Sequence, residues 1–201
     1  MPGVGILGGS FNPIHNGHIK LAEGALSAFE LEKIIFIPTG SHAFKSDAHI
    51  PEARARYEMT AAAVSDHPKF EVSPIEIKRK GISYMVDTLR ELKSTFLGAE
   101  LALIIGGDII FEIERWKDFG EYGKLCTICV AMRPGYCRND VEGHIQYLSD
   151  KYDATFKLAE IDALDISSTD IRRLAACGGD ISSMVPSGAE QYIRVNKIYG
   201  K

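Results

Sequence analysis

The sequence has no surplus of positive charge. Its 201 residues include 23 lysines and arginines against 27 aspartates and glutamates, which gives a formal net charge of −4. Such a chain has no general attraction for polyanions, so bulk binding to nucleic acid is not expected. Any anion that this protein handles must be held by a focused local site.

Long hydrophobic runs are also missing. The first three residues include no basic side chain, and the apolar run Val4 to Leu7 is far shorter than a signal-peptide core or a membrane span. We therefore expect a cytoplasmic protein with no membrane partner. Because 45% of the residues are hydrophobic, a chain of this length can bury one full core, and we predict a single domain over residues 1–201.

Cysteine is scarce, with four residues in the whole chain. Cys126 and Cys129 have the C-x-x-C spacing of metal and redox sites, but they lie in the β-favouring run Leu125 to Met132. In a strand, positions three apart point to opposite faces, so the two sulfurs would diverge. We predict that both are buried structural thiols.

Strand-length apolar runs alternate with longer amphipathic stretches along the chain. Strands are predicted at Gly3 to Leu7, Lys33 to Pro38, Phe70 to Ser73, Leu101 to Ile105, Leu125 to Met132 and Thr155 to Leu158. Helices are predicted at Gly17 to Phe29, Pro51 to Ser65, Tyr84 to Phe96, Ile109 to Glu114, Asp140 to Lys151, Ser168 to Ala176 and Gly188 to Val195. This alternation indicates an α/β fold with a mostly parallel sheet and helices on both faces. Ligands in such sheets bind beyond the carboxyl ends of the strands.

The longest irregular stretch runs from Thr39 to Ile50 and is mostly polar. Loops of about a dozen structureless residues are uncommon unless they are functional or disordered. Two interpretations stay open, a mobile flap over a ligand site and an ordinary surface loop.

A glycine-rich turn follows the first predicted strand. Gly8, Gly9 and Ser10 are followed by Phe11-Asn12-Pro13 and then by His15-Asn16-Gly17-His18, which leads into a helix. Glycines at a strand end let backbone N–H groups approach an anion, and the helix adds its positive dipole end. The segment predicts a phosphate site, although the Walker and G-x-G-x-x-G patterns are both absent from the sequence.

His15 and His18 lie three residues apart across this turn, where both rings can face one phosphate. They could also chelate a metal, but zinc needs a third or fourth ligand, and the other histidines show no paired spacing that suggests one. We therefore favour phosphate contact.

A second candidate phosphate site starts the predicted helix at Ser168. Ser167 or Ser168 could be a simple N-cap. Thr169 and Arg172, however, are three apart and share a helix face, so a hydroxyl and a guanidinium lie beside the free N–H groups of the first turn. Together these groups suit a polyphosphate.

Together the two segments resemble the nucleotidyltransferases with the H-x-G-H signature, and most closely the bacterial nicotinate-nucleotide adenylyltransferases. The resemblance covers nearly the whole chain. It also rests on Arg79 to Leu89, Ile105 to Asp108 with Trp116-Lys117, Arg133 to Gly135, Ile166 to Arg172, and the tail segments Val185-Pro186, Tyr192-Ile193 and Ile198-Tyr199.

The resemblance implies a doubly wound, Rossmann-like nucleotidyltransferase fold and a reaction of ATP with nicotinate mononucleotide that gives deamido-NAD and pyrophosphate in NAD biosynthesis. The implied catalytic residues are His15, His18 and Arg172, with the histidines at the α-phosphate. The implied ATP-binding residues are Gly8, Gly9, Ser10, Phe11, His18, Gly106, Asp108, Ser167, Ser168, Thr169 and Arg172. The implied cofactor is Mg²⁺ carried by the ATP phosphates, with no protein side chain as its ligand.

The resemblance also implies an acceptor site. Its residues are Asn12, Lys45, Tyr84, Met85, Thr88, Asp108, Trp116 and Arg133. Trp116 would stack on the pyridine ring, and Asp108 would bind ribose hydroxyls. Taken by themselves, Trp116 could equally be a large core residue and Asp108 a helix N-cap.

Two segments depart from the family pattern. Met85 stands where the family often has Thr, and His42-Ala43-Phe44-Lys45 stands where it commonly has Pro-Pro-His-Lys. These departures leave open the choice between nicotinate and nicotinamide mononucleotide. Two rival functions are an H-x-G-H enzyme with another acceptor, such as phosphopantetheine, and a catalytically silent nucleotide sensor.

Overall fold

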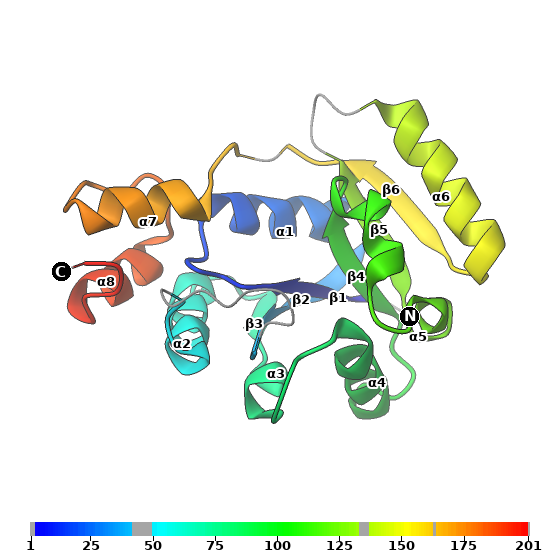
Figure 1. Ribbon diagram of the computed structural model, residues 1–201, viewed down its shortest axis with the longest axis horizontal. Coiled ribbons are helices and arrows are strands. Elements are labelled where there is room, and N and C mark those ends of the chain that lie inside the picture. Colours follow the sequence, from blue (N-terminus) through cyan, green and yellow to red (C-terminus); the bar gives the residue numbers. More distant parts are fainter. Residues whose placement is uncertain (1–2, 42–49, 133–136, 163, 201) are drawn as a thin grey trace. The chain divides into compact units, whose positions relative to one another are not determined.

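The computed structural model describes residues 3–41, 50–132, 137–162 and 164–200, and Figure 1 shows its chain trace. The chain forms two compact units. The first consists of Met1–Leu7, Leu21–Ile34 and Tyr84–Asp162, and the second of Gly8–Lys20, Ile35–Ser83 and Ala163–Lys201. The expectation of a single domain over residues 1–201 stays a prediction.

The described strands form one six-stranded sheet with the order β3-β2-β1-β4-β5-β6. The strands are β1 (Gly3–Gly9), β2 (Leu31–Pro38), β3 (Phe70–Val72), β4 (Leu101–Gly106), β5 (Thr127–Met132) and β6 (Phe156–Glu160). β1 pairs in parallel with β4, β4 with β5, and β5 with β6, with registers such as Val4 opposite Leu101. This order is that of a doubly wound α/β sheet, so the predicted fold class is confirmed.

Helices connect the strands, as parallel pairing requires. They are α1 (Asn16–Ala28), α2 (Ala53–Val64), α3 (Ile75–Lys78), α4 (Met85–Thr95), α5 (Tyr122–Leu125), α6 (Arg138–Tyr152), α7 (Ser168–Ala176) and α8 (Ser187–Val195). Within the first unit, α4 and the part of α1 from Leu21 onward lie on opposite sides of β1 (Figure 1). A strand covered on both faces has no solvent side, which is why β1, β4 and β5 are almost continuously apolar and buried.

The outer strand β6 differs because it has no buried position. Three of its five residues are partly exposed and two, Lys157 and Glu160, are exposed, in keeping with its place at the edge of the sheet. In the second unit, α8 packs on α2, and the Tyr192 hydroxyl donates to Glu58 at 2.9 Å between them.

Most predicted elements are present within a few residues of their predicted ends. The one-turn helices α3 and α5 were not predicted, because four residues are too few to show a helical period. The helix predicted from Ile109 to Glu114 is instead two 3₁₀ turns, η1 (Ile109–Phe111) and η2 (Ile113–Arg115). Leu125, predicted to start a strand, ends α5, and β5 begins at Thr127.

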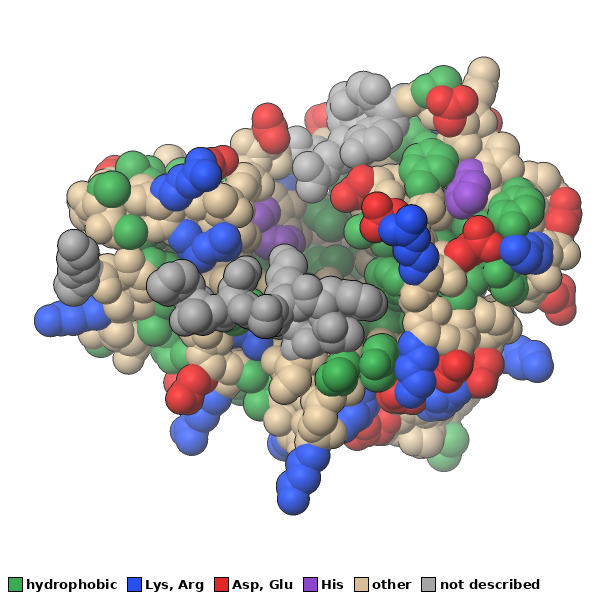
Figure 2. Space-filling view, viewed as in Figure 1, with side chains coloured by type: hydrophobic (Ala, Val, Ile, Leu, Met, Phe, Trp, Pro, Cys, Tyr) green, Lys and Arg blue, Asp and Glu red, His purple; other side chains and the backbone are tan. Residues whose placement is uncertain are grey.

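Acidic and basic side chains are interspersed over the face shown in Figure 2, in line with the small net charge. Within the described ranges, no helix is both long and apolar enough to span a membrane.

Candidate active site

The segment from Gly8 to His18 forms a tight turn between β1 and α1. Phe11, at φ 43°, occupies the left-handed region that few non-glycine residues adopt, and its ring is 2% exposed. That ring packs against Phe36, with centroids 5.8 Å apart, and edge-on to His18, with centroids 5.1 Å apart. Burial of Phe11 therefore holds an unfavourable backbone conformation in place.

Three backbone carbonyls of this turn accept hydrogen bonds from side chains distant in sequence. Ser10 O accepts from Arg56 Nη1 at 2.7 Å, Asn12 O from Arg172 Nη1 at 2.8 Å, and Pro13 O from Ser168 Oγ at 3.0 Å. In a trans peptide the C=O and N–H groups point in opposite directions. Drawing the Ser10 and Pro13 carbonyls toward these donors turns the N–H groups of Phe11 and Ile14 the other way, as an anion site requires.

The two histidine rings pack closely against each other in a tilted arrangement, with ring centroids 3.7 Å apart and an interplanar angle of 30°. The backbone N–H of His15 donates to His18 Nδ1 at 3.2 Å. Because Nδ1 is an acceptor, the neutral His18 ring carries its proton on Nε2, which makes Nε2 a hydrogen-bond donor. The predicted proximity of the two rings is thus present.

Gly17 leaves the space that the His15 ring occupies beside His18. A Cβ atom at this position would meet His15 Nδ1 at 3.0 Å, His15 Cε1 at 3.1 Å and the Leu164 carbonyl oxygen at 3.2 Å. Any side chain would therefore press on the His15 ring. The structure thus gives a steric reason for the glycine in the H-x-G-H pattern.

The second predicted phosphate segment forms the start of α7. Ser167 is its N-cap, and its hydroxyl accepts from the Thr169 N–H at 3.1 Å. Arg172 Nη2 donates to Thr169 Oγ1 at 3.2 Å, so these two side chains share a face, as predicted. Arg172 and Ser168 also bond the Gly8–His18 turn, so the structure joins the two phosphate segments within the second unit.

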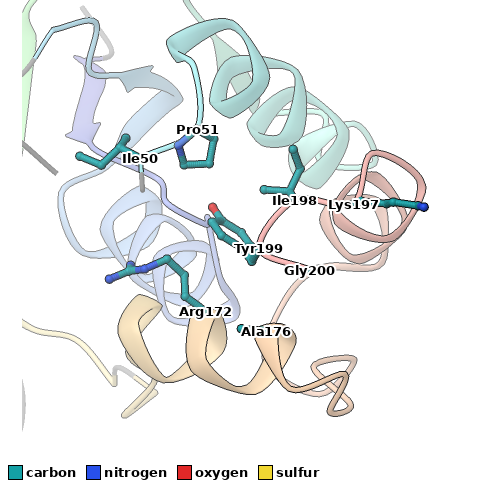
Figure 3. Close-up of a pocket in the computed structure, with 8 residues that line it drawn as sticks. All are labelled: Ile50, Pro51, Arg172, Ala176, Lys197, Ile198, Tyr199 and Gly200. Atoms are coloured by element: carbon teal, nitrogen blue, oxygen red, sulfur yellow. The ribbon is translucent and has the colours of Figure 1, made fainter. Parts of the chain in front are cut away.

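The C-terminal tail completes this part of the site. The Tyr199 hydroxyl donates to Asn12 Oδ1 at 2.6 Å, and burial raises the pKa of Tyr199, outweighing the opposing charges of Arg172 and Arg56. Tyr199 and Arg172 line a cavity of about 540 Å³. Figure 3 shows Tyr199 central among the lining residues, with the Arg172 and Lys197 cationic groups directed toward opposite ends.

Most of the predicted acceptor residues belong to the first unit, whereas Asn12 and Lys45 belong to the second. Trp116 is partly exposed, and its ring meets Tyr122 edge-on at a centroid distance of 6.2 Å. Asp108 is exposed and makes no side-chain capping bond to η1. Its carboxylate instead lies against Gly106, where a Cβ atom would meet Asp108 Oδ1 at 2.5 Å. Asp108 thus stands at the N-cap position of η1, but its side chain does not cap that turn.

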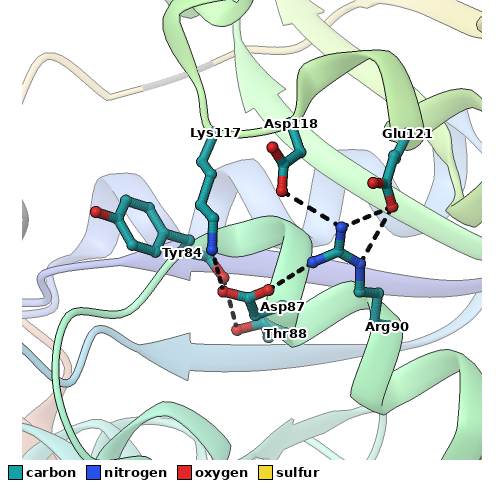
Figure 4. A network of polar contacts seen from close by, with 7 residues as sticks. All are labelled: Tyr84, Asp87, Thr88, Arg90, Lys117, Asp118 and Glu121. Carbon is teal, nitrogen blue, oxygen red and sulfur yellow. Dashed lines mark hydrogen bonds and ion pairs between the residues drawn. The ribbon is translucent and has the colours of Figure 1, made fainter.

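A charged network holds the segment after Trp116 against α4 (Figure 4). Asp87 accepts from Lys117 Nζ at 3.2 Å and from Arg90 Nη1 at 2.6 Å. Arg90 also bonds Asp118 and Glu121, and Lys117 Nζ lies 4.6 Å from the centre of the Tyr84 ring. Burial favours a higher pKa for Asp87, but the bonds and charges of Lys117 and Arg90 outweigh it and lower the pKa.

The structure places the remaining predicted acceptor residues less favourably or not at all. Thr88 is fully buried, and its hydroxyl donates to the Tyr84 carbonyl oxygen at 3.4 Å, so it can support Tyr84 but has no surface for a ligand. Met85 is the first residue of α4. Lys45 and Arg133 lie outside the described residues, as does the 42–49 part of the Thr39 to Ile50 stretch, for which a flap was one of two interpretations.

The C-x-x-C sulfurs are buried, as predicted. Cys126 is 7% and Cys129 1% exposed, and burial is the main cause that raises their pKa values to about 12 and about 11. Cys137 and Cys177 are exposed.

Over the described part of the chain, no three His, Cys, Asp or Glu side chains are grouped as metal ligands.

Arg56 is the main residue that sequence reasoning missed. It is 1% exposed, although arginine is rarely buried, and it lies in α2, far in sequence from the turn that it contacts. A basic residue within a polar helix carries no sequence signal that distinguishes it from a surface residue. Tyr199 was noted only as part of the tail, and its bond to Asn12 was likewise not predicted.

A doubly wound sheet with a glycine-rich turn between its first strand and first helix is typical of nucleotide-binding α/β proteins. Comparisons with known proteins identify the family within this class. Residues 6–174 match the cytidylyltransferase-like family. The chain is 42% identical over 198 residues to a probable nicotinate-nucleotide adenylyltransferase of Moorella thermoacetica, covering 98% of this chain and 91% of that protein. It is 38% identical over 199 residues to one of Thermoanaerobacter sp., covering 98% and 94%.

The chain therefore belongs to the nicotinate-nucleotide adenylyltransferase family of cytidylyltransferase-like proteins. Its fold is also that of the Plasmodium falciparum nicotinic acid mononucleotide adenylyltransferase complexed with NaAD. That likeness has a TM-score of 0.79 at 17% identity and covers 99% of this chain and 98% of that chain.

Proposed function

We propose that this protein transfers the adenylyl group of ATP to nicotinate mononucleotide in NAD biosynthesis. An oxygen of the acceptor 5′-phosphate attacks the α-phosphorus of ATP. The new P–O bond forms as the bond between the α-phosphorus and its bridging oxygen breaks, and pyrophosphate leaves. The products are deamido-NAD and pyrophosphate, and no protein nucleophile is needed.

The main support for the proposal is the close packing of the His15 and His18 rings on the Gly8–His18 turn. His18 has its Nδ1 occupied by the His15 N–H, so Nε2 can donate to an α-phosphate oxygen as negative charge builds there. Such a preorganised donor stabilises the five-coordinate transition state without side-chain rearrangement.

Arg172, Ser168 and Thr169 hold the β- and γ-phosphates in this proposal. The first turn of α7 provides backbone N–H groups and a positive dipole end beside the guanidinium. The contacts of Arg172 and Ser168 with Asn12 and Pro13 support the proposal, because they keep the polyphosphate and α-phosphate groups at a defined spacing.

Mg²⁺ fits this donor set only as an ion carried on the phosphates. The residues at the two phosphate segments offer imidazole, guanidinium, hydroxyl and N–H groups, whereas Mg²⁺ prefers carboxylate and phosphate oxygens. When bound, the ion neutralises part of the charge on the triphosphate. The Arg172 guanidinium offsets part of the remaining charge, and the neutral His18 ring contributes a hydrogen-bond donor rather than a charge.

Nicotinate mononucleotide is the acceptor that the names of the curated relatives support, at up to 42% identity over nearly the full chain. Partly exposed Trp116 offers an aromatic face for the pyridine ring, and exposed Asp108 can accept from ribose hydroxyls. The protein acts in the cytoplasm in this proposal, where its nucleotide substrates are made.

A pyrophosphate-release screen tests the proposal. ATP and CTP are each combined with nicotinate mononucleotide, nicotinamide mononucleotide and phosphopantetheine, and the His18→Ala variant serves as the control for contaminating activity. We expect release with ATP and nicotinate mononucleotide and much less with the other pairs. Release with phosphopantetheine alone would overturn the acceptor, and binding of ATP without release in any pair would indicate a nucleotide sensor.

A further inference from the structure

The guanidinium of Arg56 lies at the junction of three separate chain segments. Nη1 donates to Ser10 O at 2.7 Å, Nη2 to Thr39 O at 2.5 Å and Gly40 O at 3.1 Å, and Nε to Pro51 O at 3.2 Å. All these segments belong to the second unit. A single planar fork therefore fixes the relative positions of the phosphate turn, the end of β2 and the start of α2.

A buried cation of this kind is costly to fold, because both its charge and its donors are removed from water. Arg56 is 1% exposed, and burial lowers its pKa while Tyr199 and the buried carboxylate of Glu76 raise it. The arginine stays charged, since its pKa lies far above neutrality. Its bonds to carbonyls then compensate for the lost hydration, and they also dictate which way those carbonyls point.

Thr39 and Gly40, whose carbonyl oxygens accept hydrogen bonds from Arg56, are closely packed. A Cβ atom on Gly40 would collide with the Glu76 carbonyl oxygen and would meet Ser83 Oγ at 2.9 Å. The Thr39 N–H donates to Gly9 O at 2.9 Å, so β2 and the end of β1 are already bonded next to Arg56. Arg56 therefore bonds a closely packed segment that is itself hydrogen-bonded to the end of β1.

We propose that Arg56 is a positioning residue that orients the phosphate turn through the Ser10 carbonyl. With Ser10 O drawn onto the guanidinium, the Phe11 N–H points away from Arg56, and the proposal places the phosphate on that side of the turn. Arg56 contacts no substrate itself. This inference rests on the proposed adenylyl transfer for its catalytic consequence, but the orientation of the turn does not depend on which reaction follows.

The test compares Arg56→Lys with Met59→Ala. Lysine keeps the charge but has no planar fork, so it cannot reach the Ser10, Thr39 and Pro51 carbonyls together. Met59 lies on the same helix and is 1% exposed, and its truncation destabilises α2 without removing a bond to the turn. The readouts are amide hydrogen exchange over residues 8–18 and 38–41, the Kd of α,β-methylene-ATP, and kcat and KM at a temperature where both variants are folded.

For Arg56→Lys we expect amide exchange in both segments to rise about tenfold or more and the ATP analogue to bind about tenfold more weakly. We also expect kcat to fall about tenfold while the KM for nicotinate mononucleotide stays within about twofold. Met59→Ala should lower the Tm but leave local exchange, analogue binding and kcat close to wild type.

Unchanged exchange and analogue binding in Arg56→Lys, or equal effects in both variants, would overturn the inference. If the wild-type protein shows no adenylyl transfer at all, the proposed function fails, and the exchange and binding measurements still decide the role of Arg56.

Discussion

Arg172 and Asn12 are 160 positions apart in the sequence, yet Arg172 Nη1 donates to the Asn12 carbonyl oxygen at 2.8 Å. Asn12 also accepts from the Tyr199 hydroxyl through its side chain, so the turn, α7 and the C-terminal tail meet at this one residue. Hydrogen bonds thus join the two segments that are proposed to bind phosphate. Effects of substitutions in them should therefore be coupled rather than additive.

His18→Ala should retain ATP binding but lose about 100-fold or more in kcat, the usual scale for one transition-state donor. His18→Gln should retain more activity, because the glutamine amide can place an N–H near the position of Nε2. Steady-state kinetics and equilibrium binding of ATP measure the two effects. Wild-type turnover in His18→Ala would refute the role of this ring.

Gly17→Ala should lower the activity with little effect on the stability. Alanine favours the helical backbone of α1 by up to about 1 kcal/mol, and this gain offsets the cost of the close contact made by the added methyl group, so the Tm should change little. The added methyl group, however, presses on the His15 ring and the Leu164 carbonyl oxygen, and kcat should fall about tenfold or more.

Gly143→Ala is the matched control for this prediction. Gly143 lies inside α6, and nothing lies within 4 Å of a Cβ atom added there. We expect a gain of about 1 kcal/mol in stability and no change in kcat. Equal kcat values for the two alanine variants would show that the contact between residue 17 and His15 is unimportant.

Trp116→Ala should chiefly raise the KM for the mononucleotide, by about tenfold if the ring contributes a typical stacking energy. Trp116→Phe keeps an aromatic face beside Tyr122 and should stay within about threefold of wild type. The KM values for both substrates are measured for each variant. A rise confined to the KM for ATP would show that Trp116 contacts the other nucleotide.

The four thiols should fall into two classes with a thiol-reactive dye at neutral pH. Exposed Cys137 and Cys177 should react quickly in the folded protein. Cys126 and Cys129 should react only on unfolding, since burial blocks access and raises their pKa values to about 12 and about 11, leaving almost no thiolate. Fast reaction of either buried thiol would contradict their structural role.

The strand and helix pattern was predictable because each buried strand leaves a continuous apolar run, as in Leu101 to Ile105, and each long helix leaves an amphipathic period. The glycine-rich turn and the caps of α7 were also predictable, since Ser167 acts on Thr169 two residues away. One-turn helices such as α3 leave no such period, which explains why they were missed.

The sequence by itself determined the parts that depend on neighbours along the chain: the sheet type, the histidine pair with its intervening glycine, and the face shared by Thr169 and Arg172. Only the tertiary structure decided that Arg172 and Ser168 bond the Gly8–His18 turn. The same holds for the hydrogen bond from the Tyr199 hydroxyl to Asn12 and for the buried Arg56 that bonds the Ser10 carbonyl oxygen. Hydrogen bonds between residues that are dozens of positions or more apart depend on how the elements pack, and packing leaves no periodic trace in the local sequence.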